Sequence, residues 1–444
     1  MAAIGALLAV FGGILIPVGN HFIEKTIKKE AVIENGTIAY ENWIVPGCPI
    51  YRQFWVFDVQ NPEEVMEKGS APILEQKGPY TYRMRYMPKE NITEHEDGTL
   101  SYLQPNIMLF QPNMSVGPES DTVTTVNFAV VAAPALFKSV LIQALMNIWI
   151  KSSKSKFLQT RTVKEILWGY EDPFLKKIPV VKLDKLVGIF YPYNKTVDGP
   201  YRIYTGKDDI NKKGTILTFN NSRTLHYFKS YCDMINGTDA SSFHPFVSKS
   251  EQLYFFSSDA CRSVSARFDR EETVKGILLY RFSIPPSAFA SSLTNPDNIC
   301  FCTDKEISKP VYLSMPHFLS GSKILFQFVK GMKPSVEEHT TFLDVEPVTG
   351  FTLSFSKRLQ INLLVRPNSK IAALKNIKHF FYFPILWLNE TATIDDEKAD
   401  FFRSKVTNKI KLLYFLQWAL IIIGSLMFLG ILIVFFMCKD KRPK

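Results

Sequence analysis

Two long apolar segments, one at each end of the chain, restrict the fold more than any other feature of the sequence. Residues 412–437 are apolar except for Gln417 and Ser425. At 1.5 Å per residue such a helix would extend roughly 39 Å, enough to cross a ~30 Å hydrocarbon core with some tilt. A buried core helix is the alternative, but the segment ends abruptly in residues 438–444, which are rich in lysine and arginine. We therefore predict a C-terminal transmembrane helix and a cytoplasmic tail.

Residues 1–19 form the second apolar segment and contain no charged side chain. A cleaved signal peptide is the alternative. No basic side chain precedes the apolar stretch, however, and no clear small-x-small cleavage site follows it. We predict an uncleaved N-terminal anchor, which leaves residues 20–411 as one continuous domain on a single side of the membrane.

The orientation of that domain is indicated by its glycosylation signals, because basic residues occur in comparable number on the domain side of the two anchors and in the C-terminal tail. Seven Asn-x-Ser/Thr triplets all lie between the anchors, and seven in one segment indicate a surface that has met the secretory lumen. We predict a two-pass plasma membrane protein, in transit through Golgi and endosomes, with an extracellular domain. The triplets begin at Asn35, Asn91, Asn113, Asn194, Asn220, Asn236 and Asn389.

Cysteine and histidine patterns give no sign of a metal, a cofactor or a catalytic site. In an oxidising compartment the five cysteines of the domain tend to pair, although five cannot all do so within one chain. Cys300 and Cys302 cannot easily bridge to each other, so each is expected to pair elsewhere. No second Cys/His pair follows them at zinc-ligand spacing. The histidines are scattered singly, and the usual hydrolase, phosphate-binding and dinucleotide-binding motifs are absent, so we predict that the protein is not an enzyme.

Alternating apolar and polar residues predict strands over much of the domain. The pattern runs through residues 53–59, 80–86, 277–284, 351–365 and 380–388, with Pro384 indicating an edge strand or a bulge. Helices are predicted at residues 134–151, 162–169 and 395–411. The expected fold is a mainly antiparallel β domain with a helical cluster inserted at residues 134–180.

The net charge of +10 points to anionic partners, and nucleic acid is an unlikely partner outside the cell. The densest basic stretch away from the membrane contains Lys151, Lys154 and Lys156, with Arg161 and Lys164 close behind. Lysines at a helix C-terminus also complement the helix dipole, so a solvated helix end is one interpretation. Apolar residues just before them suit either helix packing or an amphipathic surface that catches lipid ligands.

Several long strings resemble the class B scavenger receptors, and the similarity extends over nearly the whole chain. It is strongest toward the branch that contains platelet glycoprotein IV (fatty acid translocase). The strings are residues 18–29, 51–62 (YRQFWVFDVQNP), 77–83 (KGPYTYR), 167–174 (LWGYEDPF), 232–238 (CDMINGT), 295–302 (NPDNICFC) and 386–391 (LWLNET).

The resemblance implies a β-barrel-like ectodomain with an apical helical bundle and an internal hydrophobic tunnel. It implies a scavenger receptor and lipid transporter that binds long-chain fatty acids, oxidised lipoproteins, anionic phospholipids and thrombospondin-type matrix proteins. Any signalling would use cytoplasmic partners reached through membrane neighbours, and the oligomeric state stays open. Ligand-binding residues would be Leu141, Lys151, Lys154 and Lys156, and the matrix-binding region would span residues 90–140, including Glu94, Glu96 and Asp97.

The resemblance also implies a bridge between Cys232 and Cys300. Cys261 and Cys302 lack their usual family partners, which fall in a segment missing between Lys309 and Pro310, and they either pair together or stay reduced. Cys438 is the remaining candidate for lipid modification. Alternatives to a cell-surface receptor are a lysosomal membrane receptor of the same family, a two-span ion-channel subunit, and a membrane-tethered ectoenzyme.

Overall fold

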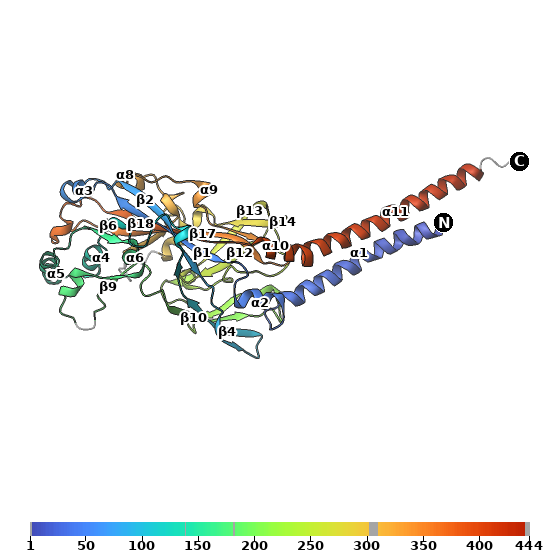
Figure 1. The fold of residues 1–444 in the computed structure, drawn as a ribbon, viewed down its shortest axis with the longest axis horizontal. Coiled ribbons are helices and arrows are strands. Elements are labelled where there is room, and N and C mark those ends of the chain that lie inside the picture. Colours follow the sequence, from blue (N-terminus) through green and yellow to red (C-terminus); the bar gives the residue numbers. More distant parts are fainter. Residues whose placement is uncertain (1, 138, 181–182, 302–309, 440–444) are drawn as a thin grey trace.

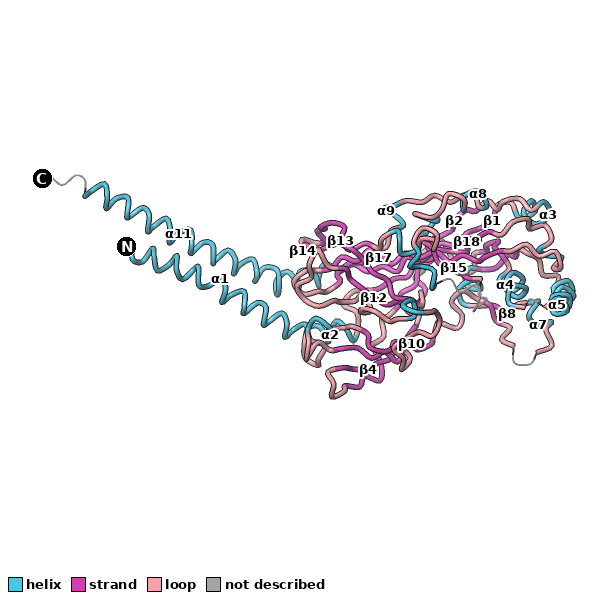
Figure 2. Tube along the Cα trace, turned by 180° about the vertical axis from the view of Figure 1, so that it is seen from behind, coloured by secondary structure: helices cyan, strands magenta, loops and turns pink. Residues whose placement is uncertain are grey.

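The computed structural model describes residues 2–137, 139–180, 183–301 and 310–439. A β-rich body carries two long helices, α1 (Ala2–Ala31) and α11 (Asn408–Lys439), which leave it side by side from the same end (Figure 1). Seen from behind, the helices again run together away from the sheets (Figure 2). Both are long and apolar enough to cross a membrane, which fits a two-pass membrane protein.

The two membrane helices pack closely through glycines of α1. Gly5, Gly12 and Gly19 are buried and lie seven residues apart, so they share one face of the helix. A Cβ atom on Gly12 would lie 3.0 Å from the backbone nitrogen of Ile421. The side chain of Gln417 is buried and donates a hydrogen bond from Nε2 to the carbonyl oxygen of Leu15 at 2.8 Å. Small residues and an interhelical hydrogen bond are the usual means by which helices associate in lipid.

A ten-stranded sheet forms the centre of the body, and all its recorded pairings are antiparallel. The strand order is β12-β13-β14-β16-β17-β18-β1-β2-β5, with β15 also paired to β17. The strands are β1 (Ile50–Val59), β2 (Leu74–Met84), β5 (Leu109–Phe110), β12 (Gln252–Ser257), β13 (Arg262–Val274), β14 (Ile277–Ser283), β15 (Val311–Ser314), β16 (Phe342–Val345), β17 (Thr352–Val365) and β18 (Phe381–Thr393).

Smaller sheets flank the central one. A four-stranded sheet has the order β11-β10-β4-β3, and two-stranded sheets are formed by β6 with β7 and by β8 with β9. Their strands are β3 (Glu90–Glu94), β4 (Thr99–Asn106), β6 (Thr122–Val126), β7 (Leu158–Thr162), β8 (Tyr170–Glu171), β9 (Leu186–Val187), β10 (Thr196–Tyr204) and β11 (Ile216–Phe219). The predicted fold class is confirmed: mainly β with inserted helices, flanked by two apolar helices.

Pro384 produces a bulge, as predicted, but not an edge. Strand β18 lies between β17 and β1, inside the sheet. Along the pairing with β17, Asn362 is opposite Pro384 and Ile361 is opposite Leu386, so one residue is skipped. Proline has no N–H to give to the ladder, and the bulge accommodates it within a central strand.

The helix predicted at residues 134–151 is wrong in its bounds, because two helices occupy this region. Helix α4 (Phe128–Leu136) ends before α5 (Val140–Ser152) begins. Asn127 caps α4 by accepting a hydrogen bond from the backbone of Val130. Near the other end, the buried side chain of Gln143 donates to the carbonyl oxygens of Pro134 and Phe137. Gln143 thus satisfies carbonyls that a continuous helix would have used.

The other predicted helices are present. Helix α6 (Val163–Trp168) begins at a capping box formed by Thr162 and Glu165. Helix α10 (Asp396–Phe402) continues through a π-helical turn into α11. The remaining helices are α2 (Ile38–Ile44), α3 (Pro62–Lys68), α7 (Pro173–Lys177), α8 (Leu325–Phe328) and α9 (Val336–His339).

Two buried histidines stack in the core beside a tryptophan pair. The rings of His317 and His339 are 4.6 Å apart, and His339 lies 5.3 Å from Trp387, which stacks on Trp55. Nδ1 of His317 accepts a hydrogen bond from the backbone of Lys333. Burial lowers the pKa of both histidines to about 4. The neighbouring His339 and Lys333 lower the pKa of His317 further, and Arg358 lowers that of His339.

Acidification is expected to destabilise the body through this histidine pair. In the unfolded chain histidine titrates near 6.5, so between about pH 6.5 and 4 the unfolded state binds more protons than the folded one. The stability due to neutral imidazoles is complete above about pH 6.5 and is lost as the pH falls toward 4. Thermal unfolding midpoints at pH 7, 5.5 and 4.5 measure the effect. In His317→Gln/His339→Gln the midpoint should vary less over this interval, and an equal slope would contradict the assignment.

Candidate functional site

Helix α5 lies at the end of the body farthest from the two membrane helices (Figures 1 and 2). Its inward face buries Gln143, Met146 and Ile150. Its outward face exposes a stripe of large apolar side chains: Leu141 (72%), Leu145 (40%) and Ile148 (60%). The spacing of four and then three residues places these three on one side of the helix. A soluble helix normally presents polar residues there, so this exposed apolar stripe is a candidate contact surface.

The predicted lysines lie where α5 ends. Lys151 is in the last helical turn, and Lys154 and Lys156 follow, all exposed. Lys154 has φ 56°, the left-handed conformation that commonly ends a helix, and the next backbone N–H bonds back to Ile150 at 3.1 Å. We call the exposed apolar stripe together with Lys151, Lys154 and Lys156 the apical patch. Leu141 lies ten residues before Lys151, or about 15 Å along the helix axis.

Two other basic residues predicted near the patch behave differently. The guanidinium of Arg161 lies 4.1 Å from the ring centre of Tyr170 and 3.6 Å from a carboxylate oxygen of Glu165. Arg161 is therefore engaged within the fold, whereas Lys164 is exposed on α6.

The acidic residues of the expected matrix-binding region lie apart from the apical patch. Glu94, Glu96 and Asp97 are exposed at the β3–β4 hairpin, and Asp97 pairs with Arg202 at 2.7 Å. Strand β4 lies toward the α2 side of the body, at a distance from α5 (Figure 1). Residues 90–140 consequently span several surfaces, and the matrix-binding role stays a prediction.

Six of the seven predicted glycosylation sites are accessible. Asn35, Asn91, Asn113, Asn220 and Asn236 are exposed, and Asn194 is half-buried. Asn389 differs, because it lies in central strand β18, is only 9% exposed and donates to Gln53 at 3.2 Å. The expectation that all seven lie at the surface is wrong for Asn389. The Asn-x-Ser/Thr pattern of residues 389–391 carries no information on whether the strand that contains it is buried.

Of the cysteine pairings considered above, one is present among the residues that the structure describes. Cys232 and Cys300 form a disulfide with their Cα atoms 5.8 Å apart, as the resemblance implied. Cys302 lies outside the described residues, so its proposed pairing with Cys261 stays a prediction. Burial raises the pKa of the Cys48 thiol, which disfavours the reactive thiolate. Cys438 falls in the last turn of α11, and its lipid modification stays a prediction.

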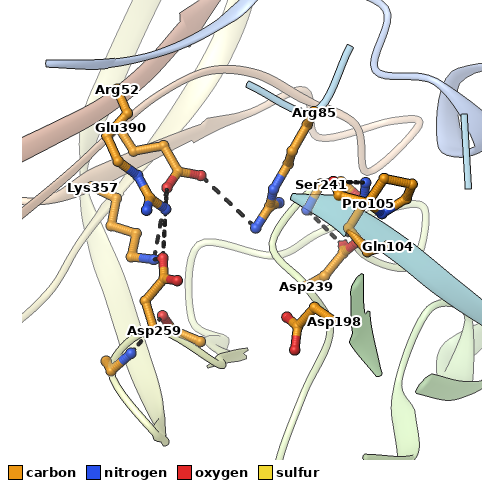
Figure 3. A network of polar contacts seen from close by, with 12 residues as sticks. Arg52, Arg85, Gln104, Pro105, Asp198, Asp239, Ser241, Asp259, Lys357 and Glu390 are labelled. Atoms are coloured by element: carbon orange, nitrogen blue, oxygen red, sulfur yellow. Dashed lines mark hydrogen bonds and ion pairs between the residues drawn. The ribbon is translucent and has the colours of Figure 1, made fainter. Parts of the chain in front are cut away.

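Sequence reasoning missed a buried cluster of charged residues in the centre of the body (Figure 3). Arg52, Glu390 and Lys357 lie directly opposite one another on the adjacent strands β1, β18 and β17. Nη2 of Arg52 is 2.5 Å from oxygens of both Glu390 and Asp259, and Lys357 is 3.0 Å from Asp259. Arg85 reaches Glu390 from the other side at 3.9 Å. Little in the sequence signals this cluster, because Arg52 and Glu390 lie just outside the predicted strands 53–59 and 380–388 and Asp259 lies in a turn.

The cluster has fixed charges rather than a reactive group. Burial alone would raise the pKa of Glu390, but the positive charges of Arg52, Lys357 and Arg85 outweigh it and lower the pKa to about 2. The same cations lower the pKa of Asp259. Three cations thus face two ionised carboxylates, and neither carboxylate is poised as a general base near neutral pH. In the described part of the chain no group of three or more metal-ligating side chains is present.

Comparisons with known proteins agree with the motifs. A family model described as the CD36 family matches residues 3–435. Lysosome membrane protein 2 of Mus musculus is 35% identical over 438 residues, covering 94% of this chain and 90% of its own length. The Homo sapiens protein of that name is 34% identical with the same coverage. Scavenger receptor class B member 1 of Cricetulus griseus is 30% identical over 447 residues, covering 97% of this chain and 87% of its own length.

Proposed function

The chain belongs to the CD36 family, and we propose that it is a cell-surface receptor that captures anionic lipid ligands at its apical patch and passes lipid toward the membrane. Relatives named as scavenger receptors support the receptor role, and they are receptors rather than enzymes. The proposal depends chiefly on one observation: an exposed apolar helix face continues into three exposed lysines at the point farthest from the membrane helices.

The chemistry of the patch suits ligands that combine hydrocarbon with negative charge. Lysines attract carboxylate and phosphate groups, and the exposed leucine and isoleucine side chains gain about 25 cal/mol for each Å² of apolar surface covered. Long-chain fatty acids, oxidised lipoproteins and anionic phospholipids fit this description. Thrombospondin-type matrix proteins are a separate proposed partner, which would use the acidic β3–β4 hairpin.

An apolar conduit through the ectodomain would explain how lipid reaches the membrane without any chemical reaction. Each methylene exposed to water costs about 0.8 kcal/mol, so a sixteen-carbon chain meets a barrier of roughly 12 kcal/mol on crossing an aqueous gap. A continuous apolar path from the apical patch to the outer leaflet would lower that barrier. Such a path is consistent with the two membrane helices leaving the end of the body opposite α5.

Charge reversal of the apical lysines is expected to abolish most ligand capture. In Lys151→Glu/Lys154→Glu/Lys156→Glu, oxidised lipoprotein and anionic vesicles should bind cells at least tenfold more weakly, because the patch then repels the negative charge of the ligand. A tenfold loss requires a change of only about 1.4 kcal/mol in the binding free energy. Binding should also weaken with salt in the parent protein and not in the variant.

The matched control reverses three exposed lysines elsewhere, in Lys195→Glu/Lys323→Glu/Lys330→Glu, with the same change in net charge. Its binding should remain near that of the parent. An equal loss of binding in both variants would indicate a general effect of net charge. Unchanged binding in the apical variant would mean that these lysines only form a solvated helix end.

A lysosomal membrane receptor is the second candidate, favoured by the relatives named lysosome membrane protein 2. Both candidates share the fold and the topology, so location decides between them. Surface biotinylation of cells expressing the untagged chain would recover most of the protein if it acts at the cell surface. Recovery of less than a tenth, with the remainder in lysosomal fractions, would favour the second candidate.

A further inference from the structure

A cavity lies where the two membrane helices meet the body. It has a volume of about 580 Å³ and is partly open. It is lined by α1 from Asn20 to Lys28, by the 3-10 turn Ile210–Lys212, by the loop from His244 to Glu251, and by Tyr414 of α11. Its size lies within the range of small-molecule sites, ~300–1,000 Å³.

The position of this cavity relative to the bilayer follows from the two helices. Residues 1–19 are free of charge, and the cavity lining on α1 starts at Asn20. The apolar run of α11 starts at Leu412, and the cavity lining on α11 is Tyr414, an aromatic residue of the kind enriched at membrane interfaces. Both helices therefore place the cavity at the level of the headgroups of the leaflet nearest the body.

Two carboxylates line the walls, each beside a nitrogen-bearing side chain. Glu24 pairs with Lys28 at 2.6 Å, and Glu251 pairs with His244 at 2.9 Å, and all four side chains remain partly exposed. Two carboxylates disfavour the carboxylate of a free fatty acid. A zwitterionic headgroup suits them better, because its ammonium can face a carboxylate while its phosphate faces Lys28.

Two exposed aromatic side chains complete the lining. Phe246 is 40% exposed and Tyr414 is 44% exposed. Phe246 has φ 62°, a strained conformation for a phenylalanine, and its loop is held by backbone hydrogen bonds from Phe246 to Val348 and from Val247 to Pro347. Aromatic rings beside carboxylates are the usual means of recognising a quaternary ammonium group.

We propose that this juxtamembrane cavity holds the choline headgroup of a phospholipid of the adjacent leaflet, with Phe246, Tyr414 and Glu251 around the ammonium and Lys28 at the phosphate. The bound lipid would fix the body against the membrane surface. The site is separate from the apical patch and does not depend on what the patch captures.

The test uses the full-length chain in liposomes containing phosphatidylcholine with a photoreactive choline group. Irradiation should label peptides containing residues 20–28 and 244–251. In Phe246→Ala/Glu251→Gln this labelling should fall at least fivefold, whereas Phe246→Tyr should retain most of it. The matched control is Glu397→Gln/Phe401→Ala, which removes one exposed carboxylate and one exposed ring from α10, outside the cavity.

Competition identifies the ligand class. Unlabelled phosphatidylcholine should displace the probe, whereas phosphatidylglycerol and palmitate should not. Labelling spread evenly along α1 and α11, equal loss in the control, or competition by palmitate as strong as by phosphatidylcholine would each overturn the proposal. An unchanged thermal unfolding midpoint of the Phe246→Ala/Glu251→Gln variant shows that the variant is folded, whatever the apical patch binds.

Discussion

Glu390→Gln is expected to lower the free energy of unfolding by about 3–5 kcal/mol, the usual cost of breaking a buried ion pair from one side. Glu390 is 2% exposed, and its carboxylate accepts from Arg52 at 2.5 Å while Arg85 and Lys357 lie near it. The variant leaves Arg52 and Lys357 to share the negative charge of Asp259, and Arg85 loses its ion pair with Glu390. Because the pKa of Glu390 is about 2, the carboxylate is ionised throughout the physiological range and the loss should be nearly constant from pH 5 to 8.

Urea unfolding followed by tryptophan fluorescence measures this change in the detergent-solubilised chain. The matched control is Glu271→Gln, which breaks an ion pair to Lys249 at 2.6 Å in which both side chains are about half exposed. Exposed pairs contribute about 0–1 kcal/mol, so the control should hardly move the midpoint. If the urea midpoint of Glu390→Gln were no lower than that of Glu271→Gln, the buried ion pairs would contribute as little as exposed ones, which would mean that water reaches the cluster.

The sequence could predict the fold class because its signals are local. Long apolar runs and the alternation of apolar and polar residues within strands each depend only on near neighbours in the chain. The charged cluster could not be found in this way. Arg52 and Glu390 are 338 residues apart and meet only because β1 and β18 pair in one register. A charged residue inside a strand pattern is read as facing solvent unless the pairing is known.

Dependence on contacts between distant or buried residues also explains the other two features that the sequence predicted wrongly, the single helix at residues 134–151 and the exposure of Asn389. The break between α4 and α5 is accompanied by side-chain hydrogen bonds from Gln143 to the carbonyl oxygens of Pro134 and Phe137, and a glutamine within an apolar stretch gives no sign of such contacts in the sequence. Asn389 is a glycosylation triplet by pattern, yet its strand is covered on both sides by its neighbours. The exposed lysines at the end of α5 could be located from the sequence because charge density along the chain is itself a local property, and their ligand-binding role stays a prediction.

The connections between the sheet and the membrane helices give the body a fixed attachment. Helix α1 leads through α2 into β1, and β18 leads through α10 into α11. Strands β1 and β18 are hydrogen-bonded neighbours, so their pairing sets how far apart the two helices can start. Arg52 and Glu390 hold these same two strands together. The buried ion pairs and the helix contacts therefore stabilise one continuous unit from the centre of the sheet into the bilayer.

Gly12→Leu is accordingly expected to separate the two membrane helices. A Cβ atom at this position would already lie 2.9 Å from Cγ1 of Ile421 and 3.0 Å from its backbone nitrogen, so four carbons cannot fit without moving α11. The helix axes should part to roughly 8–10 Å, the spacing of helices packed through large side chains. Separation would also break the hydrogen bond from Gln417 to Leu15 and leave a polar side chain facing lipid.

Spin labels on the exposed positions Ile4 and Leu429 report the separation directly by pulsed dipolar spectroscopy in liposomes, in a chain with Cys48, Cys261, Cys302 and Cys438 replaced by serine. The neighbouring substitution Gly13→Leu is the matched control, because a Cβ atom there has nothing within 4 Å. It adds the same side chain one residue away and should leave a narrow distance distribution like that of the parent. A distribution equally narrow in Gly12→Leu would show that the glycine face does not hold the helices together.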